Sequence, residues 1–440
     1  MKNHINRLTI QYSIALCLFF GVLLHPKVNA QNNTKSANQT SQPGTGQKSY
    51  NSKRSLIPQI LFSGVLIQNQ KQKQTWYIPS LFELFPANTI EGFATNLHLS
   101  FTQYLPGGRF YNLKPAVRYG WGNNRIQAQL AAQFYYKPSH KASVQLSGGR
   151  FVEQFNSKST LQALGNTMST FLSRENYLKL YERSYVALEH IAAPFKDFLL
   201  TTTISWNERS PLQNLPQYNE QNSEFTANDP VNNELTNTNF TKHQAVLWNA
   251  QLRWQAKHQY VRKRGKFKSI SPYPAIAVIY SGALAEVAAS DVSYQKIALR
   301  ITEDFNTGKW GKGKFFIEAG NFIAKDSLSF IDFKHFNGKR TAYGAFRIDD
   351  FQLLDYYQYS TTDVYLQSHY QHLFAPLAIG RIKLHPVVSA NYLHTPAGGD
   401  YWEIGGGLNK LLKFWRVDFY SSWRNQKHES IGVRFGVVID

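Results

Sequence analysis

The sequence feature that most limits the fold is a strict alternation of apolar and polar side chains. Over residues 125–136 the even positions are all apolar or aromatic, and most odd positions are Gln or Arg. A period of two sustained over this length indicates a β-strand with one apolar and one polar face. The same alternation recurs in 93–102, 111–121 and 431–437.

Two architectures produce such strands. In a soluble sandwich the apolar face is the core, and strands average about 5–6 residues. In a transmembrane barrel the apolar face meets lipid, the polar face lines a wet interior, and each strand needs about 9–11 residues. The long strands favour the barrel, and so do the aromatic residues near strand ends, which suit a membrane interface: Tyr104, Tyr119, Trp121, Tyr135 and Tyr136.

The number of strands follows from length. Residues 88–440, at roughly 22 to 25 residues for each strand and its connection, give about 14 to 16 strands, and bacterial single-chain barrels have an even number. A bilayer also excludes open sheet edges. The fold class we predict is therefore an all-β, closed, antiparallel transmembrane β-barrel of 16 strands, with 12 or 14 as alternatives.

The N-terminus has the features of a secretory signal. Lys2 and Arg7 precede an apolar run over 12–24, and Val28-Asn29-Ala30 provides the small residues that a signal peptidase accepts. We expect a signal peptide over 1–30, with an uncleaved anchor as the alternative. A polar linker over 31–54 and a barrel over 55–440 follow. The single cysteine, Cys17, lies inside the signal, so the processed chain has no disulfide and no Cys-ligated zinc.

Composition excludes other classes. Aromatic residues make up 15% of the chain, too many for a disordered protein, and only the N-terminal segment approaches the length of a membrane-spanning helix. The formal net charge is +20, but no nucleic-acid motif accompanies it. We therefore expect outer-membrane lipids and lipopolysaccharide as partners, and no nucleic acid. The sequence identifies no protein partner.

Three segments interrupt the strand pattern. Residues 160–180 contain apolar residues at helical spacing and predict a short loop helix, either a plug or a rim element. The polar stretch 207–242 predicts a long extracellular loop. A basic loop within 257–268 either binds lipid phosphates or is solvated; its charged residues are Arg262, Lys263, Arg264, Lys266 and Lys268.

Local catalytic motifs are absent from the sequence, which has no GxSxG, HExxH or phosphate-binding loop. His369, His372 and His394 are possible metal ligands, but the i, i+3 spacing of the first two places them on opposite faces of a strand. Asp349 and Asp350, adjacent on an expected strand, diverge for the same reason. We predict no catalytic residues, no metal and no cofactor. A hydrolase whose Ser and His come from distant strands stays open as an alternative.

Several blocks, taken in order, resemble a known family. They are 88–93, 117–120, 148–156, 176–182, 209–212 and 351–354, then Tyr357, Ser360-Thr361, His369 and 372–374. Together they resemble the bacterial outer-membrane family catalogued as domain of unknown function 5686. The resemblance implies a barrel of the kind used for outer-membrane protein assembly and translocation, with no established activity and no catalytic residues to transfer. Family members typically carry an N-terminal carboxypeptidase-regulatory-like sandwich and a long intervening region. In this sequence we expect only the linker over 31–54 between the signal peptide and the barrel.

Charged residues within these blocks are the candidate site. A charge facing hydrocarbon costs about 2–4 kcal/mol at mid-bilayer, so we expect these side chains to point inward and pair across the lumen. Such a network either holds a plug or gate, or only neutralises a wet interior. The residues are Glu91, Arg118, Lys179, Glu182 and Arg209.

The function we predict is that of a non-enzymatic outer-membrane barrel in envelope transport, export or assembly. The first alternative is an outer-membrane hydrolase acting on lipid or lipopolysaccharide. The second is a soluble, secreted β-sandwich binding module.

Overall fold

A computed structural model describes most of the chain beyond residue 59. The described residues are 60, 64–159, 165–167, 169–170, 174–218, 225, 227–230, 238–263, 266–344, 346–379, 382–411 and 415–437. The expected signal peptide (1–30) and linker (31–54) lie outside them.

The regular secondary structure of the described chain is almost entirely β-strand. The first strands are β1 (Val65–Asn69), β2 (Gln74–Ile78), β3 (Ala87–Asn88), β4 (Gly92–His98), β5 (Ser100–Tyr104), β6 (Phe110–Gly120), β7 (Arg125–Lys137), β8 (Ala142–Gln154), β9 (Leu180–Ala192), β10 (Phe198–Pro211) and β11 (His243–Trp254). The others are β12 (Gln259–Lys263), β13 (Lys266–Ile270), β14 (Ala275–Leu284), β15 (Ser293–Asn306), β16 (Gly311–Ser327), β17 (Tyr365–Phe374), β18 (Leu377–Ile379), β19 (Ile382–Thr395), β20 (Gly399–Leu411), β21 (Trp415–Arg424) and β22 (Lys427–Val437).

Helical structure is limited to single turns. The turns are α3 (Leu81–Leu84), η2 (Pro106–Gly108), η3 (Pro138–His140), η4 (Pro216–Tyr218), η5 (Val287–Ala289), η6 (Gly308–Trp310) and η7 (Phe330–Asp332). Residues 165–167 and 169–170 are also helical, inside the segment expected to form a loop helix. Its apolar residues Leu161, Leu164, Met168 and Leu172 lie outside the described residues. None of the helices described is long and apolar enough to cross a membrane.

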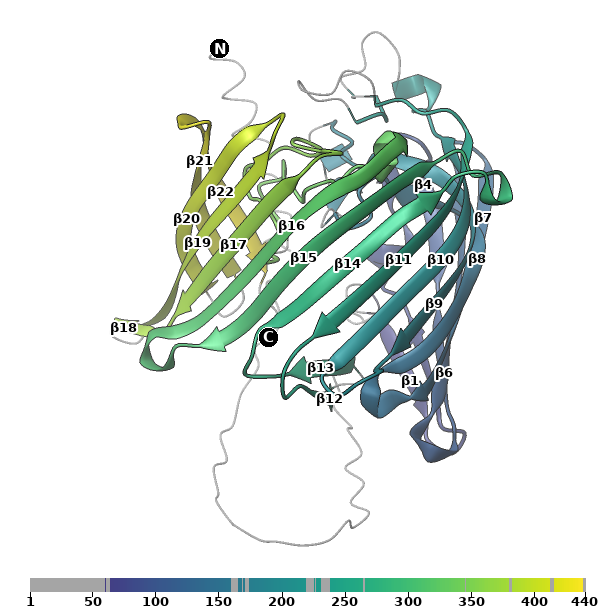
Figure 1. The fold of residues 1–440 in the computed structure, drawn as a ribbon, viewed down its shortest axis with the longest axis horizontal. Coiled ribbons are helices and arrows are strands. Elements are labelled where there is room, and N and C mark those ends of the chain that lie inside the picture. Colours follow the sequence, from purple (N-terminus) through teal and green to yellow (C-terminus); the bar gives the residue numbers. More distant parts are fainter. Residues whose placement is uncertain are drawn as a thin grey trace, which may run out of the picture. The chain divides into compact units, whose positions relative to one another are not determined.

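The strands form one large antiparallel sheet in which sequence neighbours pair. From β6 to β11 each strand pairs with the next, β11 then pairs with β14, and the order continues through β17, β19 and β20 to β22. Strands β12 and β13 form a separate hairpin between β11 and β14. Figure 1 shows β14, β15 and β16 running obliquely side by side. Local pairing of this kind follows from strands joined by short hairpin turns.

Two details of the predicted fold are wrong. The main sheet has 20 strands rather than 16, and no pairing joins β1 to β22 among the described residues, so the sheet is not closed. The count is higher partly because several strands are short pieces. Strand β3 has 2 residues and β18 has 3. Strands β4 and β5 are separated at Leu99 although both pair with β6, and a rule based on average length cannot anticipate such breaks.

The two faces of the sheet differ sharply in polarity. On β7, Ile126 is 72% exposed whereas Gln127 is 4% exposed. The exposed positions of other strands are likewise apolar, among them Leu146, Val186, Leu188, Ile204, Val278, Ile297, Leu299, Ile404, Phe419 and Ile431. The buried positions include Glu182, Asn207, Glu318, Gln367, His369, Asn391, Glu403, Asp418 and Ser422. This is the reverse of a soluble sandwich, in which the apolar face is buried.

Candidate functional site

A long loop between β16 and β17 packs on the polar face of the sheet. We call residues 328–364 the inner loop; all but residue 345 are described. Phe336, Phe351, Leu354 and Tyr359 of this loop are at most 2% exposed. They form one apolar cluster with side chains from the sheet, which are Ile279, Ala298, Tyr365, Leu393 and Tyr401. The buried face of the sheet is therefore covered by a folded segment of the same chain.

Glu403 on β20 holds one turn of the inner loop. Its carboxylate accepts hydrogen bonds from the backbone N–H groups of Gln352 (2.7 Å), Leu353 (2.6 Å) and Leu354 (2.9 Å). Asn391 and the Tyr401 hydroxyl donate two more bonds, at 2.9 and 2.8 Å. Hydrogen bonds to an ionised acceptor are about twice as strong as neutral ones, so this buried carboxylate is a strong anchor for the loop.

Two ion pairs hold the beginning of the inner loop. Arg209 on β10 donates through Nη1 to both carboxylate oxygens of Asp332, at 2.8 and 3.0 Å. Lys334 donates through Nζ to Glu318 of β16 at 2.6 Å. The Arg300 guanidinium also binds Glu318, with Nε and Nη2 at 2.7 and 2.5 Å from Oε2. Because Arg209, Asp332 and Glu318 are almost fully buried, these pairs are shielded from solvent.

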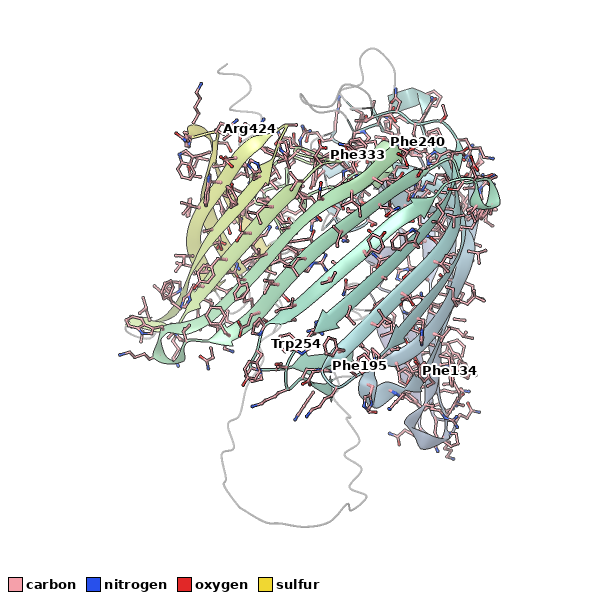
Figure 2. All side chains as sticks on the ribbon, in the orientation of Figure 1. Phe134, Phe195, Phe240, Trp254, Phe333 and Arg424 are labelled. Carbon is pink, nitrogen blue, oxygen red and sulfur yellow. The ribbon has the colours of Figure 1, made fainter. Side chains whose placement is uncertain are left out.

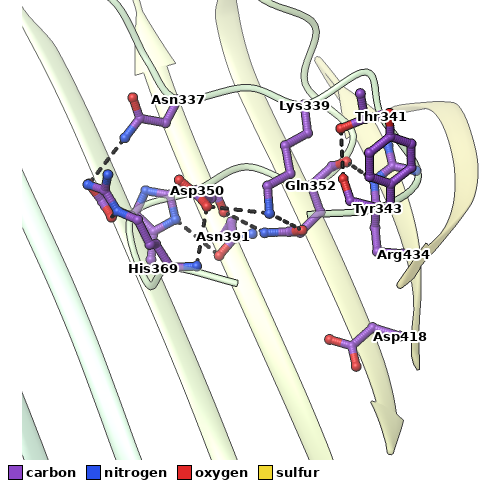
Figure 3. Close-up of polar contacts among 12 residues, drawn as sticks. Asn337, Lys339, Thr341, Tyr343, Asp350, Gln352, His369, Asn391, Asp418 and Arg434 are labelled. Atoms are coloured by element: carbon purple, nitrogen blue, oxygen red, sulfur yellow. Dashed lines mark hydrogen bonds and ion pairs between the residues drawn. The ribbon is translucent and has the colours of Figure 1, made fainter. Parts of the chain in front are cut away.

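A second polar group lies within the loop itself (Figure 3). Lys339 Nζ lies 3.4 Å from Asp350 Oδ2 and 3.2 Å from Gln352 Oε1. The other Asp350 oxygen, Oδ1, is buried and has no hydrogen-bond partner among the described residues. Burial raises the pKa of Asp350 to about 6, against the attraction of Lys339. Burial lowers the pKa of Lys339, against the attraction of Asp350.

The inner loop also reaches the last strand of the sheet. Arg434 on β22 donates through Nε to the Gln352 carbonyl oxygen at 2.6 Å. The Gly344 N–H donates to the Phe435 carbonyl at 3.0 Å, and the Phe435 N–H donates to the Ala342 carbonyl at 2.7 Å. Part of the edge that β22 would otherwise expose is therefore paired with the inner loop.

The aromatic residues expected near strand ends lie there: Tyr104 ends β5, Tyr119 and Trp121 flank the last residue of β6, and Tyr135 and Tyr136 precede the last residue of β7. Figure 2 shows Phe134, Phe195 and Trp254 towards one end of the sheet and Phe240, Phe333 and Arg424 towards the other. Phe195 is 71% exposed. Phe240 instead packs against a buried cluster that includes Phe330 of the inner loop.

The structure brings together only one pair of the predicted lumen charges. Arg118 binds both oxygens of Glu91, with Nε at 2.7 Å and Nη2 at 2.5 Å. Glu182 instead binds Arg150 at 2.5 Å, and Lys179 Nζ donates to the Ala227 carbonyl at 2.6 Å. Arg209 binds Asp332 of the inner loop, as described above. Whether these residues act in function stays a prediction.

The predicted basic loop corresponds to the β12–β13 hairpin. Arg262 and Lys263 lie on β12, and Lys266 and Lys268 lie on β13, with Lys263 opposite Lys266. Arg264 lies outside the described residues. The polar stretch predicted over 207–242 begins later than expected, because β10 continues to Pro211.

The histidine and aspartate candidates do not converge. Among the described residues no group of three or more His, Cys, Asp or Glu side chains is arranged to hold a metal ion. His369 bonds to Asn391 and His372 to the Trp310 carbonyl. The placement of Asp349 and Asp350 on a strand is wrong. Asp349 lies in a turn of the inner loop, where it binds Arg347, and Asp350 forms only an isolated β-bridge with Asn337 of the same loop.

Sequence reasoning missed the charges that hold the inner loop. Glu318, Asp332 and Glu403 were not selected. Glu403 did carry a signal, because it is a lone acid between Trp402 and Ile404 on an alternating strand. A charge at such a position points to the polar face and requires a partner. Nothing in the local sequence identifies backbone N–H groups of a distant turn as that partner.

Fold and site together define a class: an antiparallel sheet with an exposed apolar face and a polar face covered by an internal loop. The sequence matches the C-terminal domain of the family of unknown function DUF5686 over residues 58–408. The chain belongs to this family, which confirms the resemblance seen in its sequence.

Comparison with solved structures gives only weak likenesses. BamA from Haemophilus ducreyi lacking POTRA domains 1–3 is 10% identical, with 85% of this chain and 73% of that chain covered and a TM-score of 0.41. CdiB from Acinetobacter baumannii is 10% identical, with coverage of 83% and 59% and a TM-score of 0.38. A triple mutant of the Rhodopseudomonas blastica porin is 10% identical, with coverage of 78% and 89% and a TM-score of 0.32. No curated protein matches the sequence significantly. Likenesses this weak carry no argument about function.

Proposed function

We propose that this chain spans the bacterial outer membrane as a β-barrel and acts without catalysis in transport, export or assembly at the envelope. The single observation that carries the proposal is the polarity of the sheet. Apolar side chains such as Ile126 and Ile431 are more than 70% exposed, whereas Glu318 and Glu403 are at most 2% exposed. Exposed apolar surface of this extent marks an interaction surface, and strands with an apolar outside and a polar inside suit a bilayer.

The inner loop suggests how the lumen of such a barrel is blocked at rest. It is attached to strands on different parts of the sheet, through Arg209, Glu318 and Glu403. Its aromatic core packs against the inner face of the sheet. We propose that the loop occludes the lumen and moves aside when the protein acts. Outer-membrane lipids and lipopolysaccharide are the proposed partners of the apolar face.

Membrane placement is tested by expressing the full-length protein in a Gram-negative host and separating the envelope fractions. The proposal expects the protein in the outer-membrane fraction, resistant to extraction by high salt or carbonate. Recovery in the soluble periplasm contradicts it and favours the secreted binding module.

Closure by the inner loop is tested by conductance in planar bilayers. Wild-type protein is expected to give no steady current, because the proposal has the inner loop occlude the lumen. Glu403→Ala removes the acceptor of three backbone N–H groups and is expected to give transient openings. Glu429→Ala on β22, a half-exposed carboxylate paired with Arg424, is the control and is expected to stay silent. A large steady wild-type current contradicts closure.

One contact favours the hydrolase alternative. Ser329 Oγ lies 3.3 Å from His243 Nε2, and His243 Nδ1 lies 2.9 Å from the Thr241 carbonyl. A Ser hydroxyl facing a His oriented through its other nitrogen is the geometry of an activated nucleophile. However, Ser329 also caps η7, and the nearby Asp332 binds Arg209 rather than His243. Loss of esterase activity in Ser329→Ala, measured on short-chain nitrophenyl esters, supports this alternative; absence of activity in the wild type excludes it for these esters.

A further inference from the structure

Most buried cations on the polar face have a carboxylate of their own. Arg209 is paired with Asp332, Arg118 with Glu91, and Arg416 with Asp418 at 2.5 Å. Burying charges one to one limits the cost of removing them from water. Against this background, a region with surplus positive charge requires an explanation.

The surplus of positive charge lies around Glu318, whose carboxylate forms ion pairs with two cations. Arg300 and Lys334 both bind Glu318, at 2.5 and 2.6 Å. Lys296 lies four residues before Arg300 on the same face of β15, opposite Phe322 in the register with β16. Its ammonium group lies 5.2 Å from the centre of the Phe322 ring and has no carboxylate partner among the described residues.

A fourth cation, Lys158, belongs to the turn after β8. The turn is joined to the inner loop because Asn156 bonds to Asn337 at 3.1 Å and Arg347 donates to the Lys158 carbonyl at 3.3 Å. The Lys158 side chain is exposed, on a turn that contacts the inner loop. No carboxylate in the described residues forms an ion pair with it. Two of these four cations, Arg300 and Lys334, share one carboxylate, whereas Lys296 and Lys158 have no ion pair with a carboxylate among the described residues.

Aromatic rings partly support these cations but do not neutralise them. Arg300 lies 5.5 Å from the Phe316 ring centre, and Lys334 lies 5.2 Å from that of Phe336. A cation–π contact is weaker than a hydrogen bond from a cation to a buried carboxylate. A ligand carrying two or more negative charges would match the remaining charge.

We infer that Lys158, Lys296, Arg300 and Lys334 form a binding site for a phosphate-bearing anion at the junction of β15, β16 and the inner loop. Arg300 has a planar guanidinium that can donate two parallel hydrogen bonds, and the three lysines have compact ammonium groups. Both kinds of donor bind phosphate groups. The phosphate belongs either to a soluble anion or to a lipid headgroup. The site does not depend on the proposed membrane role, because its residues are placed by the fold alone.

The test is isothermal titration calorimetry of the detergent-purified full-length protein, with inorganic pyrophosphate and with short-chain phosphatidic acid, at constant ionic strength. Wild-type protein is expected to bind at least one of these probes. Lys158→Gln and Lys296→Gln are each expected to weaken binding several-fold, and the double variant at least tenfold. Lys309→Gln, in the turn between β15 and β16 where Lys309 stacks on Trp310, is the matched control and is expected to bind like wild type.

The outcomes separate clearly. Preference for phosphatidic acid identifies a lipid headgroup as the source, and preference for pyrophosphate identifies a soluble anion. Absence of binding for both probes overturns the inference, as does equal weakening by Lys309→Gln. Lys158 is exposed, so Lys158→Gln is expected to fold, and it keeps the test informative if the buried variants do not.

Discussion

Arg209 Nη1 lies 2.8 Å from Asp332 Oδ1, and this contact joins β10 of the sheet to the start of the inner loop. The two residues are 123 positions apart in the sequence, and their side chains are 4% and 2% exposed. A buried pair of this kind contributes little net stability compared with a well-packed apolar pair, but loss of one partner leaves an uncompensated charge. The pair therefore fixes the position of the start of the inner loop on the sheet in the resting arrangement.

Asp332→Asn is therefore expected to lower the free energy of unfolding by about 3–5 kcal/mol, because Arg209 is left buried without its counter-charge. The measurement is urea unfolding of the detergent-purified protein, followed by tryptophan fluorescence. Replacing both residues, Arg209→Met with Asp332→Leu, is expected to recover most of the loss.

The matched control for this pair is Asp304→Asn on β15. Asp304 pairs with Lys314, but both side chains are at least 48% exposed, so the loss is expected to stay below about 1 kcal/mol. Equal losses of unfolding free energy in Asp332→Asn and Asp304→Asn contradict the role of the Arg209–Asp332 pair in holding the inner loop.

Glu403→Gln is expected to loosen one turn of the inner loop while the sheet stays folded. A carboxamide has one acceptor oxygen and no charge. The N–H groups of Gln352, Leu353 and Leu354 therefore make fewer and weaker hydrogen bonds to residue 403. Amide hydrogen exchange at these three positions is expected to rise on the order of tenfold or more. Glu429→Gln, on β22, is the control and is expected to leave these exchange rates unchanged. An equal rise in Glu429→Gln contradicts the role assigned to Glu403.

The strands were predictable because their signal is local. The alternation over 125–136 gave β7 to within a residue, and it also gave the faces, since Ile126 is exposed and Gln127 buried. The strands expected near 111–121 and 431–437 are likewise present as β6 and β22. Alternation works here because every residue on one face of a strand meets the same environment.

The inner loop was not predictable, because its order comes from distant partners. Residues 328–364 have neither strand nor helix periodicity, and Asp349 and Asp350 were placed on a strand. The loop folds because Glu403 lies about 50 positions away and Arg209 more than 120 positions away in the chain. Closure of the sheet has the same difficulty, since whether β1 meets β22 depends on accumulated twist and register rather than on either sequence.

Asp350 is expected to make stability fall as pH rises from about 4 to about 6. Burial raises its pKa to about 6, whereas an unfolded Asp titrates near 3.9. In this window the folded state holds a proton that the unfolded state has lost, so raising the pH favours unfolding. Lys339 and Arg347 oppose the raised pKa, and Asp349 reinforces it.

The measurement is the melting temperature of the wild type and of Asp350→Asn at several pH values. The difference between the two is expected to change across this window, because Asn cannot take up the proton. A constant difference between the wild type and Asp350→Asn contradicts the raised pKa.

Leu188→Arg tests the direction in which the sheet faces. Leu188 lies in the middle of β9 and is 46% exposed, on the face we propose to meet lipid. A charge there is expected to cost about 2–4 kcal/mol in a bilayer but almost nothing in water. Folding yield into lipid vesicles, measured by the gel shift of folded barrels, is therefore expected to fall sharply. Glu189→Gln, at the next position and on the opposite face, is expected to fold like wild type. Normal vesicle insertion of Leu188→Arg contradicts the proposal that the apolar face of β9 is turned to lipid.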